Sequence, residues 1–291
     1  IERYCSLPVL GYVPGVEGVA LPERHLGLIT ARESVVNQQP WQDFADTLER
    51  TLDIDALLSL SQLTALPAGE WPALPDPQAG KGLTVAIADD EAFNFYYPDN
   101  IKLLERTGVT MTRFSPLHDS TLPECQMIWL GGGYPELHAT ALAANTPMLA
   151  QMRAAHQRGV AIYAECGGLM YLGSTLEDAS GEIHRMVDVI PGHSKMGKRL
   201  TRFGYCEAQA REQTLLAAAG EVLRGHEFHY SDFLPENPAV MACRKVRDGK
   251  TLQEWSGGWQ VGNTFASYLH VHFAQRPAML NHWLAAGREA L

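Results

Sequence analysis

The chemistry suggested by this sequence centres on Cys166. The cysteine follows a short apolar run at 160–164 that is typical of a buried strand, and it precedes Gly167 and Gly168. Two glycines permit a sharp turn into the helix expected after them. A thiol on such an elbow meets the unpaired N–H groups of the helix start, which favour the thiolate. The glycines therefore favour a nucleophile over the alternative, a small buried hydrophobic residue.

A thiol nucleophile needs a base, which is usually a histidine. His270 and His272 lie two positions apart within an expected strand over 265–273, so we expect their side chains on one face. Either ring can then serve as the base. The structural alternative is a half-buried strand with polar side chains at its edge.

An acyl-transfer site also needs backbone N–H groups that stabilise the oxyanion, each worth roughly 3 kcal/mol. Gly167 supplies one such group directly after the cysteine. Gly132 and Gly133, in the glycine triplet 131–133, can supply another because glycine lets the backbone approach a substrate closely. A plain turn is the alternative for this triplet.

Two further motifs are rejected as ligand sites. The segment 192–199 matches a P-loop except that Arg199 stands where a Ser or Thr must contact magnesium. His226, Glu227 and His229 resemble a zinc-protease motif but lack one spacer residue, and on a strand the two histidines point to opposite faces. The sequence therefore predicts no metal site and identifies no cofactor-binding residues.

Composition narrows the class of protein. The chain has 291 residues, a formal net charge of −10 and no run of basic residues, so nucleic acid and anionic membranes are not expected partners. Five scattered cysteines without a C-x-x-C pair indicate a reducing compartment. No apolar run is long enough to span a bilayer, and we see no signal peptide. We expect the cytoplasm.

The pattern of secondary structure predicts two unequal parts. Residues 7–13 read as a strand and 41–60 as one amphipathic helix. Prolines and glycines then break all regular patterns, so we place a linker at 61–82, between a first part at 1–60 and a domain at 83–291.

The larger domain alternates strands and helices. This pattern indicates an α/β fold with a mostly parallel sheet, in which the glycine triplet and Cys166 meet at the carboxyl ends of strands. In the second half of the chain the pattern of strands and helices is less regular. The expected strands are 83–88, 109–114, 127–130, 160–164, 226–231 and 265–273, and the expected helices are 98–106, 146–158 and 277–286.

Six segments together resemble the cobyrinic acid a,c-diamide synthases along essentially the whole chain. The resemblance implies a flavodoxin-like class I glutaminase domain joined to an ATP-dependent, P-loop synthetase domain similar to dethiobiotin synthetase. Such enzymes use glutamine and Mg-ATP to amidate two acetate groups of a corrin precursor in cobalamin biosynthesis. The segments are RHLGL (24–28), DEAFNFYY (90–97), GGGYPE (131–136), AECGGLMY (164–171), GHEFHYS (225–231) and SYLH (267–270).

Position by position, the resemblance implies that Cys166 attacks the glutamine amide and that His270 is its base. Many class I glutaminases place a glutamate two residues after that histidine, where this chain has His272. We therefore expect a Cys-His dyad with the third role unassigned. Glu165 and Glu227 lie within the matching segments and are further candidate site residues.

The resemblance also departs from the family at the front of the chain. No acceptable P-loop is present, so 1–60 reads as the remnant of a synthetase domain and most of that domain is missing. We expect this chain alone to hydrolyse glutamine but not to activate a carboxylate with ATP. Mg-ATP is expected only for the full-length enzyme.

Several points stay open at this stage. The acceptor is cobyrinate, hydrogenobyrinate or another tetrapyrrole acid, and a homo-oligomer is not excluded. Another cysteine hydrolase with the same elbow, or a binding module with an inert cysteine, are the alternative functions. The alternatives differ in whether the chain releases ammonia from glutamine.

Overall fold

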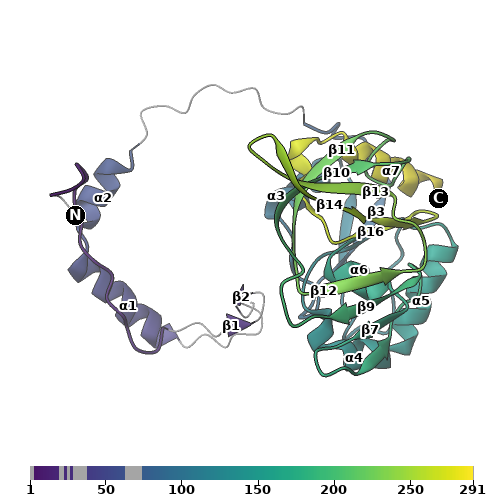
Figure 1. Ribbon diagram of the computed structural model, residues 1–291, viewed down its shortest axis with the longest axis horizontal. Coiled ribbons are helices and arrows are strands. Elements are labelled where there is room, and N and C mark those ends of the chain that lie inside the picture. Colours follow the sequence, from purple (N-terminus) through teal and green to yellow (C-terminus); the bar gives the residue numbers. More distant parts are fainter. Residues whose placement is uncertain (1–2, 20–22, 25–26, 29–37, 63–73, 291) are drawn as a thin grey trace. The chain divides into compact units, whose positions relative to one another are not determined.

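The computed structural model describes residues 3–19, 23–24, 27–28, 38–62 and 74–290. The chain divides into two compact units, Ile1–Trp71 and Pro72–Leu291, and the second contains every strand of the larger sheets (Figure 1). In the described residues no helix is long and apolar enough to cross a membrane. The boundaries placed at 60 and 82 remain a prediction.

The strand expected at 7–13 is wrong. Only Gly11 makes a bridge there, to Leu52, and the residues around it have no regular structure. Pro8 and Pro14 lack the N–H groups that a strand must donate, which explains why pairing stops after a single bridge. The first unit instead contains a two-stranded ribbon, β1 (Glu23–Arg24) paired with β2 (Gly27–Leu28).

The helix expected at 41–60 is two helices, α1 (Gln38–Thr51) and α2 (Ile54–Leu60). The interruption falls at Asp53, whose carboxylate accepts a hydrogen bond from the N–H of Ala56 at 2.9 Å. An aspartate in this position caps the first turn of a new helix, and α2 therefore starts afresh.

A six-stranded sheet forms the centre of the second unit. The strands lie in the order β15-β16-β6-β5-β3-β4, and all neighbours are parallel except the edge pair β15 and β16. The five parallel strands taken in chain order give 2-1-3-4-5, the flavodoxin-like arrangement, which confirms the expected α/β class. The strands are β3 (Thr84–Ala88), β4 (Thr110–Phe114), β5 (Met127–Leu130), β6 (Ala161–Glu165), β15 (Trp259–Val261) and β16 (Thr264–Ser267).

Side chains alternate between two cores on either side of this sheet. Ala86 and Ile128 belong to the core shared with α5 (Thr146–Gln157) and α6 (Gly167–Leu172). Val85 and Trp129 belong to the core shared with α3 (Pro98–Glu105) and α7 (Met279–Glu289). Figure 1 accordingly places α5 and α7 on opposite sides of β3 and β16. Helix α4 (Ala139–Ala144) and the 3₁₀ turn η1 (Pro135–Leu137) were not predicted.

Two further sheets, one wholly antiparallel and one mixed, account for the irregular second half of the chain. The first, in the order β14-β13-β10-β11-β17, lies against the core of α3 and α7, and the second, in the order β12-β9-β7-β8, follows α6 in the chain. The first comprises β10 (Arg202–Ala210), β11 (Val222–His229), β13 (Met241–Arg247), β14 (Lys250–Gly257) and β17 (His270–Val271); the second comprises β7 (Thr175–Glu177), β8 (Ile183–Arg185), β9 (Gly192–Met196) and β12 (Ser231–Pro235).

The two strands expected in this half are therefore each divided. The run 226–231 turns at Tyr230, between β11 and β12. The run 265–273 leaves the central sheet after Ser267 and joins the antiparallel sheet at His270. His270 consequently lies where the two sheets meet, beside the carboxyl ends of β5, β6 and β16.

Candidate active site

Cys166 occupies the elbow that the glycines predict. It follows β6 directly, starts α6, and has φ 48° and ψ −100°, a backbone conformation that non-glycine residues rarely adopt. Its N–H donates to the carbonyl of Ser267 at 2.8 Å, which ties the elbow to the end of β16. Gly168 is required next to it, because a Cβ there would lie 2.6 Å from the carbonyl oxygen of Leu130.

The side chains of Glu165, His270 and Cys166 form one connected group. Nδ1 of His270 lies 3.4 Å from Oε2 of Glu165, and the ring also makes a hydrogen bond to Cys166. Burial by itself lowers the pKa of the His270 imidazole, whereas its bonds to Cys166 and Glu165 raise it, and the net pKa is about 10. The ring therefore carries a proton at neutral pH.

Glu165 is itself held in place. Its Oε1 accepts hydrogen bonds from the hydroxyl of Tyr163 and, at 3.4 Å, from the N–H of Val271. Only 2% of the residue is exposed, so its charge acts on His270 with little screening by water. The structure thus places the Glu165 carboxylate beside the His270 imidazole.

His272 does not share this face. Strand β17 ends at Val271, and His272 instead caps the 3₁₀ turn η2 (Phe273–Gln275), its Nδ1 accepting from the N–H of Ala274 at 3.3 Å. Its Nε2 lies 3.9 Å from the carboxylate of Asp99. The expectation that both histidines project from one strand face is wrong, because the strand is too short to include His272.

The glycine triplet lies against the same group. A Cβ on Gly132 would lie 2.6 Å from Cε1 of His270, so the loop approaches the ring at a distance that only glycine allows. The N atom of Gly133 lies 3.1 Å from where a Cβ of Gly167 would stand. Among the described residues no backbone carbonyl accepts a hydrogen bond from the N–H of Gly133 or of Gly167, and both residues are buried. Two buried donors therefore lie close together next to the cysteine.

Comparison with known proteins identifies the family to which these residues belong. The family model described as the CobB/CobQ-like glutamine amidotransferase domain matches residues 84–278, which is more than half of the chain. The chain belongs to this family. Strand β3 begins at the first matched residue, so the glutamine amidotransferase domain coincides with the α/β part of the second unit.

Curated relatives of this glutamine amidotransferase chain are longer than the chain itself. It is 80% identical over 291 residues to the cobyrinate a,c-diamide synthase of Salmonella typhimurium, covering 100% of this chain and 63% of the relative. It is 48% identical over 286 residues to the enzyme of the same name from Listeria monocytogenes, covering 98% and 63% respectively. A solved structure described as a glutamine amidotransferase has a TM-score of 0.47 and 14% identity, covering 70% of this chain and 98% of the other.

Glu227, a further sequence candidate, lies apart from the cysteine group of this amidotransferase domain. It is buried on β11, with Oε2 3.4 Å from Nε2 of His229 and Oε1 accepting from Nε1 of Trp255 at 3.4 Å. It lines a separate cavity of about 310 Å³ together with Arg202 and Tyr268. The polar partners of the Glu227 carboxylate are therefore His229 and Trp255, and His270 is not among them.

His226 was not predicted to be a neighbour of His270. Its ring stacks on that of His270 because the two residues are directly paired between β11 and β17. The signal in the sequence was the motif GHEFHYS, but only the pairing of the two strands reveals the contact. The P-loop-like segment, by contrast, forms β9 and is followed by no helix, which agrees with its rejection.

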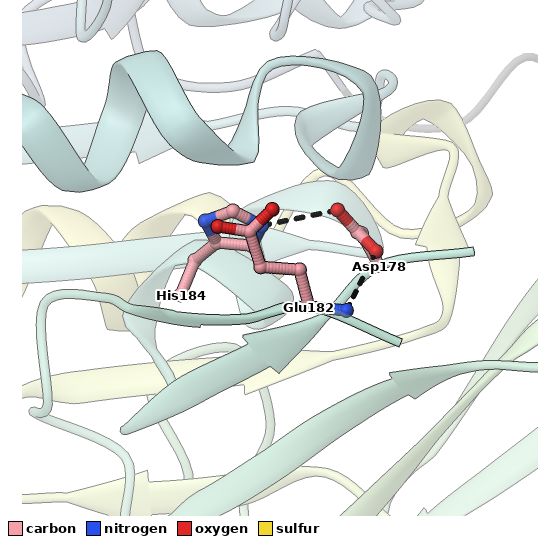
Figure 2. A group of neighbouring side chains, drawn as sticks. All are labelled: Asp178, Glu182 and His184. Atoms are coloured by element: carbon pink, nitrogen blue, oxygen red, sulfur yellow. Dashed lines mark hydrogen bonds and ion pairs between the residues drawn. The ribbon is translucent and has the colours of Figure 1, made fainter. Parts of the chain in front are cut away.

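A group of three side chains of the kinds that bind metal ions was also not predicted from the sequence. Asp178, Glu182 and His184 have ligand atoms within 4.8 Å of one another. Figure 2 shows the Asp178 carboxylate bonded to His184 and to the backbone N–H of Glu182, each at 3.0 Å. Hydrogen bonds from Ser180 and His184 lower the pKa of Asp178. These contacts close the turn between β7 and β8, which accounts for the arrangement without a metal ion.

Proposed function

We propose that this chain hydrolyses glutamine through a Cys166 thioester and supplies ammonia for a,c-diamidation of cobyrinate or a related tetrapyrrole acid. The observation that carries the proposal is the connected group of Cys166, His270 and Glu165. The relatives that bear the name cobyrinate a,c-diamide synthase support the acceptor class. The chain spans only 63% of their length, so the whole reaction is proposed and not assigned.

The first half of the reaction forms the thioester. His270 holds the proton of the Cys166 thiol while the sulfur attacks the amide carbon of glutamine. Negative charge then moves to the amide oxygen, where the N–H groups of Gly133 and Gly167 are the proposed donors. As the tetrahedral intermediate collapses, the C–N bond breaks and His270 delivers the proton to the nitrogen, which leaves as ammonia.

The second half regenerates the enzyme. His270, now neutral, takes a proton from water, whose oxygen attacks the thioester carbon. Collapse of this intermediate breaks the C–S bond, which leaves the Cys166 thiolate beside the protonated imidazole and releases glutamic acid, whose remaining carboxyl proton passes to solvent. Glu165 holds Nδ1 throughout, so the same ring orientation serves both halves, as the third member of a triad does.

The amide-forming step requires an activated carboxylate, and Mg-ATP is the proposed source of that activation. Among the described residues the segment closest to a P-loop is β9, which cannot cradle phosphates. We therefore propose that this chain performs the glutaminase half, in the reducing environment of the cytoplasm. Glutamine- and ATP-dependent corrinoid amidation by this polypeptide alone would contradict that division.

The test is ammonia release from glutamine by the purified chain, with mass spectrometry of its cysteines. A glutamine-analogue electrophile should add its mass to the peptide containing Cys166 and to no other. Cys166→Ala should abolish both signals, whereas Cys125→Ala should keep them. Burial raises the pKa of Cys125 to about 11, so this thiol is a matched unreactive control.

Two outcomes would favour the alternatives. Cleavage of esters or peptides without ammonia release from glutamine would indicate another cysteine hydrolase on the same elbow. Failure of every electrophile to label Cys166 would indicate a binding module with an inert cysteine.

A further inference from the structure

One peptide bond of the glycine triplet has its orientation set by a neighbouring segment. The carbonyl oxygen of Gly132 accepts hydrogen bonds from the N–H groups of Asn94 at 3.1 Å and Phe95 at 3.0 Å. All peptide bonds of the described residues are trans, so a C=O and the N–H that follows it point in opposite directions. The N–H of Gly133 therefore points away from Asn94 and Phe95. Its nitrogen lies 3.1 Å from where a Cβ of Gly167 would stand, beside the cysteine.

Without these two bonds the peptide can turn over. Glycine on both sides leaves the peptide plane between Gly132 and Gly133 without side chains that oppose rotation. Half a turn would direct the Gly132 carbonyl towards Cys166 in place of the Gly133 N–H. A carbonyl oxygen there repels the negative charge that develops on the substrate, whereas an N–H stabilises it. The bonds from Asn94 and Phe95 therefore decide which group meets the oxyanion.

Asp90 fixes the start of the loop that makes these bonds, residues 90–97. It is buried, with 4% of the residue exposed. One oxygen of its carboxylate accepts from two N–H groups of the loop itself, at 2.9 and 3.1 Å. The other oxygen accepts from the Ser115 hydroxyl at 2.8 Å and the Leu117 N–H at 2.9 Å, just after β4. The carboxylate therefore ties the loop to the end of a neighbouring strand.

Tyr96 fixes the end of the loop and contacts the glycine triplet directly. Its hydroxyl donates to the carbonyl of Ala88, at the end of β3, at 2.6 Å and accepts from the N–H of Gly131 at 2.8 Å. Burial raises the pKa of this hydroxyl well above its ordinary value of 10, so it keeps the proton that it donates. The carbonyl of Gly131 accepts in turn from the N–H of Gly168 at 3.1 Å. The Tyr96 hydroxyl therefore connects β3, the glycine triplet and the cysteine elbow.

We propose that Asp90 and Tyr96 are positioning residues of the glutaminase reaction. They hold loop 90–97 against the glycine triplet, and the loop keeps the Gly133 N–H directed at the oxyanion. Every bond in this arrangement comes from the domain itself, so the donor is oriented before glutamine binds. This inference rests on the proposed glutaminase function and deepens it, because it assigns the residues that prepare the site for the charged intermediate.

The experiment uses two variants at opposite ends of the loop and one matched control. Tyr96→Phe removes only the hydroxyl. Asp90→Asn keeps the shape of the side chain but replaces one acceptor oxygen by a donor. The control is Tyr171→Phe, at a buried tyrosine of α6 whose hydroxyl has no hydrogen-bond partner among the described residues.

Three measurements separate orientation of the donor from reactivity of the thiol. Iodoacetamide reacts at a methylene carbon without forming an oxyanion, so its rate at Cys166 reports the thiolate alone. A chloroketone analogue of glutamine is attacked at a ketone, whose oxygen takes up negative charge as the amide oxygen does. Glutamine turnover gives kcat and KM. Circular dichroism establishes that each variant is folded.

We expect Tyr96→Phe and Asp90→Asn each to lower kcat about tenfold, because the donor spends less time in the productive orientation. KM and the iodoacetamide rate should stay within about twofold of wild type, since the donor acts on the charged intermediate more than on bound glutamine. Inactivation by the chloroketone should slow by the same factor as kcat. Tyr171→Phe should match wild type in every measurement, because it breaks no hydrogen bond.

A wild-type kcat in either loop variant would overturn this inference and leave the glutaminase function intact. Parallel losses of kcat, glutamine affinity and iodoacetamide reactivity would show that the loop supports the whole site, and would also overturn it. Absence of ammonia release from wild type would instead refute the proposed function, and the inference with it.

Discussion

The imidazole ring of His226 stacks on the ring of His270, with centroids 4.9 Å apart and planes inclined by 16°. Nδ1 of His226 lies 3.1 Å from the hydroxyl of Tyr97, which restrains the ring at its other side. Burial lowers the pKa of His226, and the charge on His270 lowers it further. His226 therefore stays neutral while His270 is protonated, and it supplies a flat, uncharged surface for that ring.

Replacing His226 should separate the role of the flat ring from the role of its nitrogens. His226→Ala should lower kcat about tenfold with little change in KM, because His270 loses the surface that orients it. His226→Phe keeps an aromatic ring and should stay within about threefold of wild type. Steady-state glutaminase kinetics provide the measurement. His193→Ala, an exposed histidine paired with Glu236, is the control, and equal losses in the Ala and Phe variants would contradict the stacking role.

Glu165→Gln removes the charge beside Nδ1 while keeping a side chain of the same shape. We expect kcat to fall about tenfold to hundredfold with KM nearly unchanged, because the carboxylate stabilises the protonated imidazole. The pH profile gives the specific signature. Since Glu165 raises the pKa of His270, the alkaline limb of kcat should move to lower pH in this variant.

A matched control for this charge removal is Glu177→Gln. It alters the ion pair between Glu177 on β7 and Lys195 on β9, in the four-stranded sheet. That variant should have the kcat of wild type and the same alkaline limb in its profile of kcat against pH. A Glu165→Gln enzyme with a wild-type pH profile would show that the carboxylate acts only on the fold.

Gly132→Ala tests the close approach of the glycine loop to the base. The new methyl group would lie 2.6 Å from Cε1 of His270, so the ring or the loop must shift. We expect activity to fall at least about tenfold, since small displacements at a catalytic group cost about that much or more. Ammonia release is measured alongside circular dichroism, which should be unchanged. Gly15→Ala, where an added Cβ meets no atom within 4 Å, should keep full activity.

The raised pKa of His270 predicts how stability depends on pH. The folded state favours the protonated ring, so this contribution is fully present below the ordinary value of 6.5 and disappears as pH rises through about 10. Denaturant unfolding of wild type and His270→Gln should therefore differ more at pH 6 than at pH 10. A difference that grows with pH would mean that the ring is held neutral.

The elements of the central sheet were predictable because their signals are local. The runs 83–88, 127–130 and 160–164 are apolar and end at glycine or polar residues, and each forms a buried strand within a residue or two of the expected bounds. The elbow at Cys166 follows from its two glycines in the same way. Local sequence sets both features.

The assignment of strands to sheets was not predictable, because it depends on partners far away in the chain. The run 265–273 begins and ends with phenylalanine and mixes apolar residues with Ser267 and two histidines, and no glycine or proline within it marks the change from one sheet to the other after Ser267. The contacts of His270 with Glu165 and His226 depend on this change of sheet, because it places His270 beside both residues. The same reason explains why His272 was expected on the wrong face.

The strained backbone at Cys166 has a consequence for how this protein can change over time. A residue with φ 48° outside glycine costs the fold on the order of 1–3 kcal/mol. Glycine at this position would remove that cost, and mutants selected only for heat resistance should drift toward it while losing the sulfur. We therefore expect a cysteine at this strained position to persist only under selection for turnover, which acts against selection for durability.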